Sequence, residues 1–572
     1  MNLLAAQNIN NNRNIMKKLQ MISAITSLLI ATPLMAQTTI IKNINGYTLS
    51  GETLIKFSAI SFTNDTINKT YQPGETVDIA SDVVVIDGHG KTMLPGLIDA
   101  HGHVLGYGHS LLRVDLVNSA SEADAVNRTI VYAKDNPSQH WVLGRGWNQV
   151  QWLNNSYPSA KSLDKAFPDK PVWLRRVDGH AGWANSKAMA LAGITSASKG
   201  PAGGEIIRDE NGQPTGVFID NAMELIIASI AQPSRSEDKL ALTKAMHSLA
   251  SLGLTSVHDA GIDQNNINLY KELASENNMT IRINGMLYLP SENWQQQLAQ
   301  GPFKTHDDMF IFNSVKIQAD GALGSRGASL INDYSDHAGH KGLLLHDKET
   351  LQHYIDFAMN AGFQVNTHAI GDNANKLILD LYQQAIAKSN TKSLRHRIEH
   401  AQVLRLVDIP RFASLNVIAS MQATHATSDK NMAVTRLGEQ RILGAYAWRK
   451  LLDSNAVIAA GSDFPVESPN PFYGLHAAIT RQDHNNSPQG GWYGDQKMTP
   501  VEALRSFTLD AAYAAHQEKL IGSLEAGKKA DFILLSDDIF TMPASQIWQS
   551  QVLQTWVAGK KVFSLAEPSV AK

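Results

Sequence analysis

Residues 95–104 read Pro95-Gly96-Leu97-Ile98-Asp99-Ala100-His101-Gly102-His103-Val104. A Pro-Gly pair, which favours a turn, leads into a short apolar run that ends in two histidines one residue apart. Alternate side chains of a β-strand share a face, so His101 and His103 point the same way, about 6.6 Å apart along the strand. Two such imidazoles suit one divalent ion at the carboxyl end of a strand. A His-x-His pair alone is a weak signal, and its weight depends on further ligands at other strand ends.

Seven more apolar runs follow, and most of them precede a segment with helical periodicity. The eight runs are Leu97–Asp99, Ser256–His258, Ile281–Leu287, Ser314–Ile317, Phe363–Asn366, Arg397–Glu399, Val417–Met421 and Ala456–Ala460. Strands that alternate with helices predict parallel βαβ units, and eight such units close a (β/α)8 barrel. We therefore predict an α/β fold with a TIM barrel over residues 95–521.

The first two of these runs lie far apart in the sequence. About 150 residues separate them, many more than a βαβ unit requires. The gap predicts an inserted α/β subdomain over about residues 112–235.

Both ends of the chain have β character. Residues 37–94 include the strand-like segment Thr48–Ser58, and residues 522–566 include Phe532–Leu535 and Gln554–Val557. We expect the two ends to form one small β-sandwich domain, discontinuous in sequence.

The composition of the 572-residue chain excludes several kinds of partner and site. Its net charge is −3, so no basic field points to nucleic acid or to a membrane surface. It contains no cysteine, which excludes disulfides and thiolate ligands. A metal ion must therefore be held by histidine, a carboxylate or a modified lysine.

Residues 1–36 have the pattern of a secretory signal peptide. Met16-Lys17-Lys18 precedes a mostly apolar run from Leu19 to Ala31, and cleavage is expected after Ala36. The apolar run is too short to span a bilayer comfortably. An amphipathic helix is the alternative, and Met16 competes with Met1 as the start. We expect a periplasmic or secreted protein with no stable membrane anchor after cleavage.

Residues with metal-binding side chains follow the strands of the predicted barrel. Catalytic groups of such barrels come from the carboxyl ends of several strands. Besides the first-strand histidines, these ends carry Lys316, His368, His400 and Asp463. Side chains so distant in sequence meet only if the barrel prediction is right. We expect them to hold one or two divalent ions.

Two of these assignments leave alternatives open. As a free ammonium, Lys316 would repel a metal ion and would be a core lysine paired with a carboxylate. After carbamylation by CO2 it would become an anionic oxygen ligand that can bridge two ions. Without the carbamate, a single ion on His368, His400 and one or both of the first-strand histidines is the alternative. His396 and His400 lie four residues apart and compete for one ligand position, and the strand end favours His400.

Several stretches of the sequence resemble the amidohydrolase superfamily and, within it, the branch that includes N-substituted formamide deformylases. The matching segments are Pro95–His103, Gly144–Trp147, Asp178–Ala181, Gly203–Ile206, Asp320–Arg326, His368–Asp372 and Gly461–Glu467. The resemblance covers nearly all of the chain that follows the signal peptide. It implies a metal-dependent hydrolase barrel, commonly with zinc, and a small β-sandwich built from both chain ends.

With the metal in place, we expect hydrolysis by metal-bound hydroxide. A divalent ion lowers the pKa of bound water from about 16 to roughly 7 and polarises the scissile carbonyl. Asp463 is expected to take the proton of the water and return it to the leaving amine. A role for Asp463 as a metal ligand is compatible with this.

Substrate contacts are expected from the long loops and the insertion. The candidates are Trp147, Trp183, His180, Asp320, Arg326 and His425. The tryptophans are pocket walls or packing residues, and His180 is an oxyanion donor or part of a structural turn. Asp320 and Arg326 bind substrate or order their loop. His425, just past the seventh strand, faces the pocket or the surface.

We predict an exported amidohydrolase that cleaves a carbon–nitrogen bond of a small molecule, such as an N-formyl or cyclic amide. An esterase or lactonase on the same metal site is the first alternative, since fold does not determine function. A non-catalytic binding or regulatory protein is the second, and the intact ligand set argues against it. The expected partner is a small-molecule substrate, and a homodimer is the candidate assembly.

Overall fold

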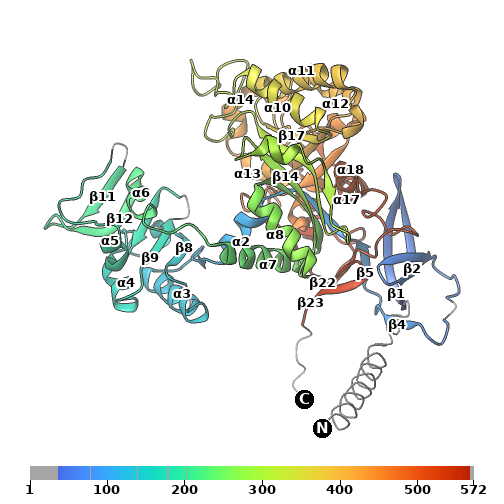
Figure 1. Ribbon diagram of the computed structural model, residues 1–572, viewed down its shortest axis with the longest axis horizontal. Helices are drawn as coiled ribbons and strands as arrows, with labels where there is room; N and C mark the ends of the chain where they lie inside the picture. The colour runs from blue at the N-terminus through green and yellow to red at the C-terminus, as the bar shows by residue number, and fades with distance from the viewer. Residues whose placement is uncertain (1–36, 78, 138, 177–178, 202–203, 567–572) are drawn as a thin grey trace, which may run out of the picture.

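The structure of the chain is a computed structural model that describes residues 37–566 except 78, 138, 177–178 and 202–203. The predicted signal peptide, residues 1–36, lies outside the described residues. Within the described part, no helix is both long and apolar enough to cross a membrane. Figure 1 shows three parts: a central barrel, an inserted subdomain to its left, and a sheet formed by the two chain ends to its right.

Parallel strands form the nearly closed barrel at the centre of the molecule. In chain order they are β6 (Leu97–Gly102), β13 (Leu254–Ile262), β14 (Arg282–Leu289), β16 (Phe310–Gln318), β17 (Gln364–Ala369), β18 (Arg397–His400), β19 (Ile418–Gln422) and β20 (Ile458–Gly461). Each strand hydrogen-bonds to the next in this order, and a short strand β15 (Phe303–Lys304) pairs antiparallel with β16. Every predicted apolar run overlaps one of these strands. The predicted barrel is confirmed.

The first and last barrel strands meet through their carboxyl ends. The backbone N–H of Asp463 donates to the carbonyl of His101 at 2.7 Å, and the N–H of His103 donates to the carbonyl of Phe464 at 2.8 Å. The contact is tight: a Cβ on Gly461 would lie 2.6 Å from the backbone nitrogen of His101. The ring of Phe464 leaves no room for a Cβ on Gly102 either, at 2.2 Å. Both glycines are therefore required by close approach.

Helices cover the outside of the barrel. They are α7 (Arg235–Ser251), α8 (Gln264–Ser275), α9 (Trp294–Leu298), α10 (Lys348–Asn360), α11 (Asp372–Ser389), α12 (Ile409–Leu415), α13 (Ala423–Asp429), α14 (Ala433–Arg441), α15 (Trp448–Asp453), α16 (Pro471–Thr480), α17 (Pro500–Ser506) and α18 (Leu509–Ala514). Several begin at sequence signals that satisfy the free N–H groups of the first turn. Ser234 and Glu237 form a capping box at the start of α7, and Thr499 and Glu502 form one at α17.

The two chain ends share one sheet. Its order is β23 (Lys560–Ser564), β22 (Val552–Val557), β21 (Phe532–Leu535), β5 (Thr92–Pro95), β1 (Thr38–Ser50), β2 (Thr53–Thr63) and β3 (Thr66–Tyr71), and β4 (Val84–Asp87) also pairs with β1. The sheet folds back on itself, so that Phe62 of β2 packs against Phe532 of β21 and Trp556 of β22. This core is the discontinuous β-sandwich that the sequence predicts.

One expected strand is divided in two. The segment Thr48–Ser58 forms a hairpin, because β1 ends at Ser50 and β2 begins at Thr53. Gly51 in the turn has φ +58°, which a glycine adopts without strain.

A buried ion pair joins the sheet of the chain ends to the barrel. Arg282 of β14 donates to Asp531, which precedes β21, at 2.7 and 3.0 Å, and both side chains are almost fully buried. Asp531 also accepts the backbone N–H of Ala558 at 2.7 Å, and its carbonyl accepts from Gly96 just before β6. The C-terminal strands are thus tied to the start of the barrel.

The insertion folds as an α/β subdomain with its own core. Its sheet has the order β11 (Gly204–Arg208), β12 (Pro214–Asp220), β10 (Ala181–Ala184), β9 (Val172–Arg176), β8 (Val142–Trp147) and β7 (Val114–Asp115). Its helices are α3 (Glu122–Asp135), α4 (Ala160–Ala166), α5 (Ser186–Leu191) and α6 (Glu224–Ile227). Helix α2 (Val104–Leu111) leads into the subdomain from β6 and packs against α7, as Figure 1 shows.

Candidate metal centre

A cavity of about 430 Å³ opens at the carboxyl ends of the barrel strands. The six predicted metal ligands all line it: His101, His103, Lys316, His368, His400 and Asp463. They come from β6, β16, β17, β18 and the residues after β20. The structure therefore brings together side chains that are up to 362 positions apart in the sequence.

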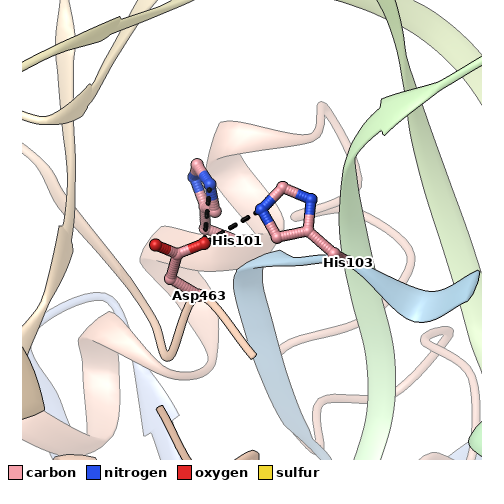
Figure 2. Close-up of side chains that lie close together, drawn as sticks. All are labelled: His101, His103 and Asp463. Atoms are coloured by element: carbon pink, nitrogen blue, oxygen red, sulfur yellow. Dashed lines mark hydrogen bonds and ion pairs between the residues drawn. The ribbon is translucent and has the colours of Figure 1, made fainter. Parts of the chain in front are cut away.

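His101, His103 and Asp463 form the first group of candidate ligands. Figure 2 shows both imidazoles directed toward the Asp463 carboxylate. The Nε2 atoms of His103 and His101 lie 2.9 and 3.5 Å from Asp463 Oδ1. One ligand atom from each of the three residues lies within 4.8 Å of the others, a spacing that suits one shared ion.

Lys316 lies next to this group, in the interior of the barrel. Its Nζ is 3.1 Å from Nε2 of His101, and the side chain is buried. Burial lowers the pKa of Lys316 to about 8, although Glu399 and Asp463 favour its charged form. A fraction of the amine is therefore neutral near pH 7–8, which is the form that reacts with CO2.

His368 and His400 also line the cavity. Their ring centroids are 4.6 Å apart, and His400 lies 4.8 Å from His101. Nδ1 of His400 is 2.7 Å from Oε1 of Gln422 on β19, so its Nε2 is left for the cavity. Nε2 of His368 is buried and has no hydrogen-bond partner.

The backbone at two strand ends is strained in a way that directs side chains into the cavity. His400 has φ 73° and Asp463 has φ 61°, both in the left-handed region that non-glycine residues rarely adopt. Each such residue costs on the order of 1–3 kcal/mol, and such strain gathers at functional sites. His396, its competitor, faces the other way: its Nδ1 accepts the backbone N–H of Val365, and its ring packs near Tyr382 of α11.

The protonation states in the cavity match those that a metal requires. Burial, assisted by the Lys316 charge, lowers the pKa of His101 to about 4, and burial with the neighbouring His368 lowers that of His400 well below its usual value. Burial opposes ionisation of Asp463, but the hydrogen bond with His103 and nearby imidazoles hold its pKa well below the ordinary range. Neutral imidazoles and an ionised carboxylate are the ligand forms that bind cations. The residues present fit a divalent metal.

Sequence reasoning missed a buried acid that holds His101. Glu399, fully buried, bonds Nδ1 of His101, which leaves Nε2 of that ring for the cavity. Arg397 in turn pairs with Glu399 at 2.8 Å and donates to the carbonyl of Ala100 and to Nδ1 of His258. The signal was present as two opposite charges, Arg397 and Glu399, two residues apart in the four-residue strand β18. His258 at the end of the second apolar run is therefore part of the same network.

Two of the predicted substrate-binding residues, Asp320 and Arg326, lie in the loop after β16. Asp320 is buried and accepts the backbone N–H groups of Ser329, Ile370 and Gly371 at 2.8–3.0 Å. Arg326 pairs with Asp336 in the same loop. Both side chains order the loop, which is one of the two alternatives, and neither lines the cavity.

The candidates in the insertion lie away from the cavity. Trp147 and Trp183 are fully buried in the core of the subdomain, where their indole N–H groups donate to the carbonyls of Leu174 and Ser159. They are packing residues rather than pocket walls. The His180 side chain is 76% exposed and pairs with Asp220 at 2.8 Å, so the structure does not bring it to the metal ligands. His425, by contrast, lines the cavity beside His400 and Asp463.

Known proteins match most of this chain. A model described as "Amidohydrolase family" matches residues 84–563. The chain is 34% identical over 507 residues to Protein LONG AFTER FAR-RED 3 of Arabidopsis thaliana, covering 85% of this chain and 84% of that protein. It is 33% identical over 484 residues to Putative amidohydrolase YtcJ of Bacillus subtilis, covering 83% and 89%.

Two further comparisons are with a relative whose name states an activity and with a separate protein of known structure. N-substituted formamide deformylase of Arthrobacter pascens is 26% identical over 492 residues, covering 84% of this chain and 90% of that protein. The crystal structure of an uncharacterized metal-dependent hydrolase from Pyrococcus horikoshii superposes with a TM-score of 0.71 at 26% identity, covering 89% of this chain and 99% of that one.

Replacement of Glu399 by glutamine tests whether the Glu399 carboxylate orients the ring of His101. The amide keeps the size of the side chain but removes the charge that Arg397 and the His101 N–H share. Because groups that orient metal-binding histidines typically account for 10–100-fold in metal affinity, we expect Glu399→Gln to weaken zinc binding by roughly that factor. Competition with a chelator measures this, with the exposed Glu439→Gln as the control. Equal zinc affinity in the two variants would refute the role.

Proposed function

This chain belongs to the amidohydrolase family, a family of metal-dependent hydrolases, and from that premise we propose that it hydrolyses a carbon–nitrogen bond of a small amide. The observation that carries the proposal is the cavity in which five imidazoles, a buried lysine and an ionised carboxylate converge. The relative named N-substituted formamide deformylase supports an N-formyl or similar amide as substrate.

We assign the metal ligands to two positions. His101, His103 and Asp463 would hold one ion, and His368 and His400 would hold a second, with carbamylated Lys316 between them. Nitrogen and oxygen ligands of this kind favour zinc among the common divalent ions, and zinc is our proposal. When bound, the metal lowers the pKa of water and polarises the carbonyl that is attacked.

Asp463 is the residue that we propose to move the proton. Its carboxylate is ionised and only slightly exposed, and a histidine approaches each of its two oxygens: His103 at Oδ1 and His425 at Oδ2. It can accept the proton of the attacking water as a base and deliver it to the departing amine as an acid. The leaving amine would thus depart neutral.

The rest of the cavity wall favours a small, partly apolar substrate. Tyr288, Leu323, Ile370 and Val466 supply apolar surface. The remaining polar and acidic side chains of the wall are Gln318, Gln402, Ser428, Asp429 and Glu467. Pockets with a mostly apolar wall and a few polar groups suit small molecules. An amide whose nitrogen carries an apolar substituent fits this distribution.

A bridging carbamate makes a prediction about metal content. We expect the chain that begins at Gln37, prepared without chelator and with bicarbonate present, to bind about two zinc ions. Lys316→Ala should lose at least one of them, because the bridge between the two positions is removed. Elemental analysis measures the content, and Lys450→Ala, on the surface, is the matched control. One ion per chain in both the parent and Lys316→Ala would exclude the carbamate and leave a mononuclear site.

A panel of substrates tests the bond that is cleaved. We expect the zinc-loaded protein to hydrolyse N-substituted formamides and related small amides. Their kcat/KM should be at least about tenfold above that of matched esters and lactones, because the proposed proton transfer from Asp463 assists an amine leaving group most. Asp463→Asn should reduce the rate by about 10²–10⁴-fold. A preference for the esters or lactones would show that the protein is an esterase or lactonase rather than an amidase. Zinc-loaded protein without turnover on the whole panel would favour the binding or regulatory alternative.

We also propose that the protein is exported and acts on its substrate as a periplasmic or secreted enzyme, with a homodimer as the candidate assembly. The pattern of residues 1–36 supports export. Fractionation of producing cells should find the full chain shortened by about 36 residues and outside the cytoplasm. A chain that begins at Gln37 should stay inside. Retention of both forms in the cytoplasm would overturn the proposal.

A further inference from the structure

We infer that His425 donates a hydrogen bond from Nε2 to the carbonyl oxygen of the bound substrate and stabilises the negative charge that develops there. The inference rests on the proposed function and adds a catalytic residue to it. It begins with the place of His425 in the fold. Strand β19 ends at Gln422 and α13 starts at Ala423, so His425 lies in the first turn of α13, and its side chain lines the cavity.

The ring of His425 is fixed in orientation by its neighbours. It lies nearly parallel to the ring of His400, with centroids 5.9 Å apart and an interplanar angle of 21°. Its side chain is 14% exposed, and the imidazole forms part of the cavity wall. A catalytic donor needs such a fixed position, since a donor that must first reorient contributes less to the transition state.

Nε2 of His425 has no hydrogen-bond partner although it is buried from solvent. An unpaired buried polar atom costs about 1–3 kcal/mol, so it is normally found only where a ligand or water completes its bonding. Oδ2 of Asp463 lies 3.8 Å from this nitrogen, which is beyond hydrogen-bond distance. Nε2 is therefore the ring nitrogen left for a group inside the cavity, and in the tautomer that we propose it carries the N–H.

The geometry points to the reacting carbonyl as that group. His103 approaches Oδ1 of Asp463 and His425 approaches Oδ2, so the two rings lie on different sides of the carboxylate proposed to move the proton. A carbonyl positioned for attack by a water held at Asp463 would lie within reach of both. His180, the oxyanion donor predicted from the sequence, is not near this point, and His425 supplies the missing donor.

Coordination of a metal ion by His425 is the competing role. His400, His425 and Asp463 each place a ligand atom within 4.8 Å of the others. Both metal positions assigned above, however, receive their ligands from other strands, and His425 is not needed to complete either one. The two roles differ in what a substitution does to metal content.

Two substitutions separate the roles, because each keeps one property of the imidazole. His425→Phe keeps a ring that can stack on His400 but has no N–H, whereas His425→Gln keeps an N–H near the position of Nε2 but has no ring. We expect His425→Phe to lower kcat on the best amide of the panel by about 10²–10³-fold, with little change in KM and no change in zinc content. His425→Gln should lower kcat by less than about tenfold. The exposed His306→Phe is the control.

Binding of methylphosphonate provides a readout that needs no turnover. This tetrahedral anion resembles the geometry of the attacked carbonyl, and calorimetry on the zinc-loaded protein measures its Kd. We expect His425→Phe to raise the Kd about tenfold and His425→Gln to raise it by no more than about threefold. If the parent protein turns over no amide or ester, the proposed function fails, and this binding series still decides the inference.

Three results would overturn the inference. Loss of zinc from both variants would make His425 a metal ligand. Impairment of His425→Gln with a normal His425→Phe would make it a packing residue for His400. Equal methylphosphonate affinity in the parent and both variants, or no binding to the parent, would remove the donor role.

Discussion

The closure of the barrel between β6 and β20 is the contact on which the rest of the site depends. Two backbone hydrogen bonds join residues 101–103 to residues 463–464, and Gly102 and Gly461 allow the strands to approach that closely. The same few residues carry His101, His103 and Asp463. Any shift in the closure would therefore move three candidate ligands at once, and the position of the ion is determined by backbone packing as much as by side chains.

Beneath the ligands lies a set of buried charges that balance one another. Burial of a charge is costly unless it is paired and hydrogen-bonded. This condition is met by two consecutive contacts. Arg397 neutralises Glu399, and Glu399 in turn bonds the ring of His101. Burial opposes ionisation of Glu399, but Arg397 and His101 keep its pKa well below the usual value. His101 is thus oriented by an ionised carboxylate.

Much of the fold was predictable because barrel strands are short apolar runs at regular intervals, and the ligands follow those runs. Local detail was harder. Strand alternation places His396 and His400 on one face, yet the left-handed backbone at His400 turns it into the cavity while His396 packs outward. The sequence around Trp147 and Trp183 does not distinguish a tryptophan of the pocket wall from one packed in the subdomain core. Glu399 escaped notice because its contact with His101, 298 positions away in the sequence, forms only in the closed barrel.

The sheet shared by the chain ends has a consequence for the order in which the protein folds. Strand β5 pairs with β21, which is made more than 430 residues later, and Asp531 must reach Arg282 before the junction is complete. Until the ribosome has released the last segment, β5 has an unpaired edge, and unpaired edges promote association between chains. A nascent or translocating chain must therefore be kept from its neighbours until its final strands arrive. Loss of the last 40 or so residues would leave that edge open permanently, exposing a surface for aggregation in an otherwise finished barrel.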